Sequence, residues 1–139
     1  MRRLPFILLV TLVLMGCGDS RLKTVPVSGK VVFPDGSPAR TGTIEFESRD
    51  FPITATGQIS PDGSFVLGTY ESNDGAVAGF HQVIILQMVI NDGTINHSMD
   101  HGKMVDPKFA TYGLSGLNVM VDREKENYLV IEVTSVTKK

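Results

Sequence analysis

The stretch Val27–Pro38, VSGKVVFPDGSP, decides the fold class. Its first seven residues follow the period-two pattern of a strand with one buried face. The PDGS that follows is typical of a tight turn, because proline presets the first turn angle and glycine adopts the positive φ that a reversal needs. A strand that runs directly into such a turn indicates β-hairpin architecture. The residues expected to face a core are Val27, Gly29, Val31 and Phe33.

The rest of the chain repeats this pattern, with Val, Ile, Thr and Gly abundant and helical periodicity rare. A second PDGS lies at Pro61–Ser64, DREKEN forms a polar reversal before the last strand, and one helical turn is expected within Asp106–Tyr112. We therefore predict an all-β fold, a seven-stranded antiparallel β-sandwich. The expected strands cover residues 27–33, 42–48, 55–60, 64–70, 79–90, 117–121 and 128–133.

The stretch Gly79–Ile90, GFHQVIILQMVI, differs from the others because both of its alternating sets are largely apolar. Such a strand is covered on both faces. We expect the segment after it to fold back as a lid, because single domains rarely leave large apolar patches bare. The alternative is that another protein covers the outer face.

The first residues form a targeting signal. Arg2 and Arg3 precede an apolar run, Leu4–Met15, and small residues follow it. The run is much shorter than the roughly 20 residues that a membrane-spanning helix needs. A basic start, a short apolar middle and a small residue at the end are typical of a secretory signal.

Leu14-Met15-Gly16-Cys17 resembles a bacterial lipobox. In such lipoproteins a diacylglycerol alkylates the cysteine, cleavage occurs just before it, and a fatty acid such as palmitate acylates the new amino terminus. Cys17 is the only cysteine, so it has no disulfide partner, and a signal segment supplies no histidine to activate a nucleophile. We predict lipidation at Cys17, with an ordinary cleaved signal as the alternative. The expected organisation is a signal peptide at 1–16, a lipid-anchored tether at 17–24 and a folded domain at 25–139.

The lipid on Cys17 would make the membrane the first partner of the protein. The expected location is extracytoplasmic, at the cell membrane or the outer membrane. The outer membrane is favoured because Gly18, and not the aspartate that retains many lipoproteins at the inner membrane, follows the cysteine. The formal net charge is −2 and no basic stripe is present, so nucleic acid is not an expected partner.

The order of motifs resembles a family of small lipoproteins that are abundant in planctomycete-type bacteria. Their exported part is a transthyretin-like domain, also called carboxypeptidase-regulatory-like. The resemblance implies a prealbumin-like Greek key and a non-enzymatic envelope module that contacts an envelope protein not yet identified. Its matching residues are structural and include Gly29, Asp62-Gly63 and Asp74-Gly75, while Phe109 replaces a tyrosine of the family. The motifs are VPVSGKVVFPDGSP, GTIEFE, PDGSFVLGTY, NDGAVAGFHQVII, DPKFATYGLSGLNVMV and NYLVIEV.

Candidate chemistry is sparse. His97, Asp100 and His101 form the one cluster of coordinating side chains, but the surrounding residues are typical of a loop and a third firm ligand is not evident. No serine stands in a G-x-S-x-G elbow. We therefore expect no metal, no cofactor and no catalytic residues. An enzyme would become the better hypothesis if His81 joined these three residues in one pocket.

A glycan- or small-ligand-binding domain is the alternative function. Sugar sites usually offer aromatic platforms, and the chain has three tyrosines and no tryptophan. Tyr70 and Tyr112 together at one exposed end would favour this function, whereas scattered tyrosines would count against it. The third tyrosine is Tyr128.

Overall fold

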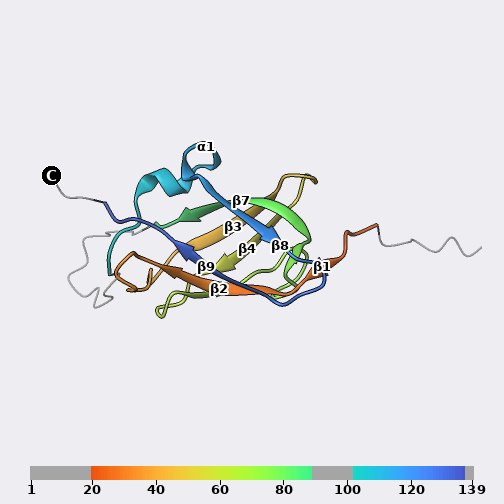
Figure 1. Cartoon of the computed structure of the whole chain (residues 1–139), viewed down its shortest axis with the longest axis horizontal. Coiled ribbons are helices and arrows are strands. Elements are labelled where there is room, and N and C mark those ends of the chain that lie inside the picture. Colours follow the sequence, from red (N-terminus) through yellow and green to blue (C-terminus); the bar gives the residue numbers. More distant parts are fainter. Residues whose placement is uncertain (1–19, 89–101, 137–139) are drawn as a thin grey trace, which may run out of the picture.

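The computed structural model describes residues 20–88 and 102–136 (Figure 1). Strands dominate this part of the chain, so the predicted all-β class is confirmed. The strands are β1 (Thr24–Val25), β2 (Val27–Val32), β3 (Thr43–Ser48), β4 (Thr54–Gln58), β5 (Ser64–Val66), β6 (Ala76–Val77), β7 (Gly79–Leu86), β8 (Leu117–Val121) and β9 (Asn127–Glu132). The helical elements are a 3-10 turn, η1 (Pro107–Ala110), and α1 (Tyr112–Ser115).

Two larger sheets face each other across the core (Figure 1). One sheet has the order β4-β3-β7-β8 and is antiparallel throughout, and the other has the order β5-β2-β9. Phe46 of β3 and Phe65 of β5 join the sheets, with ring centroids 6.1 Å apart. The short strands β1 and β6 form a third sheet of two strands.

Two details differ from the sequence-based prediction. Each of the seven expected stretches contains a strand, but β1 and β6 bring the number in the described residues to nine. The arrangement is also not wholly antiparallel, because β2 and β9 pair in parallel, from Val27↔Asn127 to Val32↔Glu132. Period-two alternation identifies a strand and its buried face, but it carries no information on the direction of the neighbouring strand.

The predicted inward sets of the first strands are confirmed. Val27, Val31 and Phe33 are buried, as are Ile44 and Phe46. Burying an aliphatic or aromatic side chain of this size contributes about 1.5–3 kcal/mol, so these positions fix which face of each strand turns inward.

Both PDGS turns form by the same chemistry. The carboxylates of Asp35 and Asp62 each accept a hydrogen bond from the hydroxyl and the backbone N–H of the serine two residues later, Ser37 and Ser64. The bonds from Ser64 lower the pKa of Asp62. The pKa of Asp35 is lowered most by a hydrogen bond from Lys103 and then by the bonds from Ser37.

The connection before β8 contains the expected helical turn. The Asp106 carboxylate accepts a hydrogen bond from Lys108 N–H and begins η1, and Pro107 occupies its first position. Gly116, with φ of 65°, ends α1 in the left-handed conformation. The Ser115 hydroxyl donates to the Val83 carbonyl of β7 at 2.7 Å, which fixes α1 against that strand.

The N-terminal part of the described chain lies at the end of the domain where β7 begins and β8 ends (Figure 1). Thr24, predicted as the last residue of the tether, pairs with Val77 in the β1–β6 sheet. Leu22 also contacts the domain, because its N–H donates to the Tyr70 hydroxyl at 3.0 Å.

Candidate functional site

Most of the predicted site residues lie outside the described residues: Cys17, His97, Asp100 and His101. Within residues 20–88 and 102–136, no three His, Cys, Asp or Glu side chains gather in a way that could hold a metal ion. The same ranges contain no helix that is long and apolar enough to cross a membrane.

His81 is described, and its ring lies inside the sandwich. Its side chain is 1% exposed, its Nδ1 lies 3.0 Å from the Gly79 carbonyl oxygen, and its ring centroid is 6.0 Å from that of Phe46. Burial lowers the pKa of His81, against the opposing effects of the Gly79 carbonyl and of Asp50. A neutral, packed imidazole of this kind is a core residue.

The three tyrosines have separate surroundings. The Tyr112 hydroxyl lies 3.4 Å from Glu45 Oε2, and burial, with Glu45 next, raises the pKa of Tyr112 to about 12. Tyr70 contacts the N-terminal segment, where the Arg21 guanidinium lies 5.3 Å from its ring centroid. Tyr128 is exposed on β9, in the β5-β2-β9 sheet. The three tyrosines therefore do not form one aromatic platform.

Among the described residues, the cover on the outer face of β7 is only partial. Ile84 is buried, and its register partner on β3 is Glu45, which the Tyr112 hydroxyl contacts. The start of α1 therefore covers the middle of the strand, as the predicted lid requires. Phe80, nearer the beginning of the strand, remains 58% exposed.

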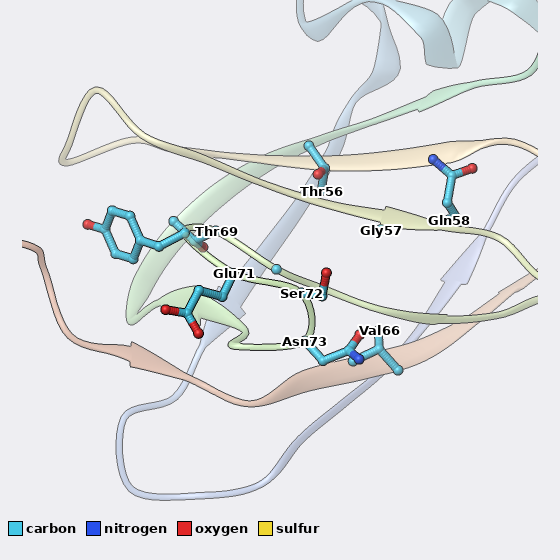
Figure 2. A pocket seen from close by; sticks show the side chains of 10 residues that line it. Thr56, Gly57, Gln58, Val66, Thr69, Glu71, Ser72 and Asn73 are labelled. Carbon is cyan, nitrogen blue, oxygen red and sulfur yellow. The ribbon is translucent and has the colours of Figure 1, made fainter.

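A polar groove of about 450 Å³ lies between the outer side of β4 and the loop that follows β5 (Figure 2). Strand β4 contributes Thr56 and Gln58, and the loop contributes Glu71, Ser72 and Asn73. In Figure 2 the Glu71 and Asn73 side chains point in different directions, so the lining offers hydrogen-bonding groups without a common focus. Among the described residues, neither histidine nor cysteine lines this groove, so the hydroxyl groups of Thr56, Thr69 and Ser72 have no imidazole beside them to activate one as a nucleophile.

Asp74 shapes the wall of the groove. Its carboxylate accepts hydrogen bonds from the backbone N–H groups of Thr69, Tyr70 and Glu71, at 2.6, 3.1 and 3.2 Å. Burial raises the pKa of Asp74, but these three bonds outweigh it, and the pKa is lowered overall. Sequence reasoning gave Asp74-Gly75 a structural role but did not find the groove, because Thr56 and Gln58 come from a separate strand, β4.

Sequence reasoning also missed an apolar area on the outer face of the β5-β2-β9 sheet. Tyr128 is 56% and Val130 62% exposed, and Val66 is about half exposed. Ser28 of β2 is the register partner of both Val66 and Tyr128, so the side chains of these three residues share one row of the sheet. We call Val66, Tyr128 and Val130 the outer-sheet patch. The signal in the sequence was an apolar residue at two of the three outward positions of YLVIEV, Tyr128 and Val130; the third is Glu132.

No protein-family model, curated protein or solved structure matches the chain. The resemblance to transthyretin-like lipoproteins therefore stays a prediction.

Proposed function

We propose that the protein is a lipid-anchored, extracytoplasmic lipoprotein whose domain is a non-enzymatic module for contact with another envelope protein. Cys17 carries the lipid, and the anchor lies in the cell membrane or, preferably, the outer membrane. The finer fold that we propose is the seven-stranded, transthyretin-like Greek key, in which β1 and β6 are additions. Support comes from the order of basic, apolar and small residues before Cys17 and from the alternation of the seven longer strands.

The observation that carries the contact function is the outer-sheet patch. Its three apolar side chains lie on one solvated sheet face, Tyr128 and Val130 along β9 and Val66 across Ser28 in the same row, where alternation normally places polar residues. In the described part of the chain, β9 is also the last strand of its sheet. An edge strand with apolar outward side chains is suited to protein contact, because main-chain bonds and side-chain pockets contribute together.

The non-enzymatic character is supported by the positions of the polar side chains. His81 packs in the core, and the groove of Figure 2 is lined by hydroxyl, amide and carboxylate groups that point in different directions. Nucleophilic catalysis of the triad kind requires a nucleophile, a base and an orienting group within hydrogen-bond reach of one another, and His81, the one histidine among the described residues, is held in the core.

The anchor is tested by feeding cells a radiolabelled fatty acid. The wild-type protein should incorporate the label, and Cys17→Ser should not. Serine is nearly isosteric with cysteine, so a loss of label in this variant would show that the Cys17 thiol is required for lipid attachment. Equal labelling of both proteins would show that Cys17 is not the lipid site.

The contact function is tested with the photo-cross-linking amino acid benzoylphenylalanine, which resembles tyrosine. Placed at Tyr128, it should give one discrete adduct in intact cells on irradiation. Placed at Tyr70 as the matched control, it should not give that adduct. The further change Val130→Glu should abolish the adduct without lowering the melting temperature, because Val130 is exposed. Identical adducts from both positions, or none from position 128, would contradict the proposal.

A glycan- or small-ligand-binding function is the second candidate, and the groove of Figure 2 is the observation that favours it. Tyr70 lines this groove together with amide, hydroxyl and carboxylate groups. Titration with soluble peptidoglycan fragments and other envelope oligosaccharides tests it by calorimetry. Binding that disappears in Tyr70→Ala, but not in Tyr128→Ala, would favour this candidate.

A further inference from the structure

A second apolar area lies at the end of the domain from which the N-terminal segment leaves. Phe80 of β7 and Met120 of β8 are register partners, and both are about half exposed. Met120 and Phe51 line one surface hollow, and Phe51 and Leu22 line the adjoining hollow. These four side chains, which come from four separate segments, are called the end patch.

The end patch is close to the expected lipid. Leu22 is only five residues after Cys17, and an extended chain spans at most about 3.6 Å per residue, so the two Cα atoms are at most about 18 Å apart. The first described residues lie beside the beginning of β7 and the end of β8, as Figure 1 shows. Acyl chains on Cys17 would therefore hold this end of the domain at the membrane surface.

The charges around the end patch are mixed. Lys23 lines the hollow between Leu22 and Phe51, Asp50 and Asp122 line the hollow beside Met120, and Arg123 lines both. Lysine and arginine place their charges among lipid headgroups while their aliphatic stems stay in apolar surroundings. The two carboxylates weaken any purely electrostatic attraction to anionic lipid, so the apolar side chains must supply most of the contact.

We propose that the end patch docks onto the lipid surface, with Phe51 and Leu22 at the level of the headgroups. The proposal rests on the lipid anchor proposed above. The anchor makes this contact intramolecular in effect, which raises the local concentration of the membrane at the patch to about the millimolar range. A weak apolar contact then suffices to orient the domain, and the outer-sheet patch, on the other sheet, stays available for protein contact.

The chain contains no tryptophan, so a single introduced tryptophan reports its own surroundings. Phe51→Trp is the probe, because it replaces one large exposed aromatic side chain by another. Val136→Trp is the matched control. Val136 is exposed to a similar extent as Phe51. Its neighbour Ser135 forms a β-bridge with Val105, and the Val105 N–H donates to the Gln87 side chain, just after the end of β7. Strand β7 is about 23 Å long at 3.3 Å per residue, so Val136 lies near the end of the strand opposite to the end patch.

The experiment uses the full chain expressed in bacteria, purified with its native processing and reconstituted into vesicles of phosphatidylcholine and phosphatidylglycerol. Part of the phosphatidylcholine carries brominated acyl chains, which quench tryptophan on contact. The expected result is strong quenching and a blue-shifted emission for Phe51→Trp, and neither change for Val136→Trp. Adding Phe80→Glu to the Phe51→Trp chain should reduce the quenching, because it places a charge in the end patch.

The outcomes separate docking from anchoring. The mass of the purified protein shows whether Cys17 carries lipid, and an unmodified Cys17 would overturn the anchor. A lipidated protein whose tryptophans at 51 and 136 are equally unquenched would overturn the docking and leave the anchor intact. A blue shift at position 51 without quenching would show that protein, either a second copy or another partner, covers the end patch, which also overturns docking.

Discussion

At Gly29, the backbone of β2 is approached from both of its neighbouring strands. A Cβ at this position would lie 1.9 Å from the Leu129 carbonyl oxygen and 2.8 Å from Phe65 Cζ. We expect Gly29→Ala to destabilise the domain by about 3 kcal/mol, because backbone and a packed ring must both shift. Urea unfolding followed by circular dichroism measures the change.

Gly113 provides the matched control for this substitution. It lies in α1, and an added Cβ would meet nothing within 4 Å. Gly113→Ala should be neutral or stabilising by up to about 1 kcal/mol, because alanine loses less conformational freedom in a helix. If the two variants unfold at the same urea concentration, the close approach at Gly29 does not exist.

The burial of His81 predicts that the stability of the domain depends on pH in a specific way. Burial keeps its pKa in the folded state below the ordinary value of 6.5. As the pH falls below about 6.5, the unfolded chain therefore binds a proton that the folded chain does not, and the free energy of unfolding decreases. The decrease should reach at most about 1.4 kcal/mol per pH unit and should level off below the folded-state pKa.

The measurement is urea unfolding between pH 7.5 and 5. His81→Gln should flatten the profile in this window. Because the remaining histidines are His97 and His101, the double variant His97→Gln/His101→Gln is the control and should keep the wild-type slope. A wild-type slope in His81→Gln would assign the titration to another group.

At the scale of the element, the connection before β8 depends on one buried hydroxyl. Strand β8 pairs with β7 only as far as Val83, whose carbonyl accepts the hydrogen bond of Ser115. Ser115→Ala leaves this carbonyl without its partner and should cost about 1–3 kcal/mol. Asn118→Ala is the control, because the exposed Asn118 amide donates to the Gly116 carbonyl on the same turn. It should change the free energy of unfolding by less than about 0.5 kcal/mol in the same thermal or urea measurement.

The sequence predicted those elements whose chemistry is local. The PDGS turns formed as expected because Asp35 and Asp62 bond to residues only two positions away. The pairing of β1 with β6 could not be predicted, because Thr24–Val25 and Ala76–Val77 are too short to show a period. The same limit applies to the groove, whose polar side chains come from β4 and from a loop that Asp74 holds in place.

At the scale of the whole molecule, the two surface patches depend on which strands and helices become neighbours. Alternation placed Phe80 and Tyr128 on strands, but it did not show that α1 covers Ile84 and leaves Phe80 exposed. The parallel pairing of β2 with β9 likewise joins segments about a hundred residues apart in the sequence. Such long-range pairs depend on how the core closes, which no short window of sequence describes.

This pairing makes the fold depend on its last strand. Ile131 and Val133 from the C-terminal region are buried in the core, and β9 is the parallel neighbour of β2. A chain that ends at Glu126 loses both side chains and one complete ladder, a loss comparable with the roughly 5–15 kcal/mol that stabilises a typical domain. It should show no cooperative thermal transition by circular dichroism, whereas a chain that ends at Val136 should melt like the full chain. A cooperative transition in the shorter chain would mean that the sandwich closes without β9, and that Tyr128 and Val130 belong to a strand that can detach.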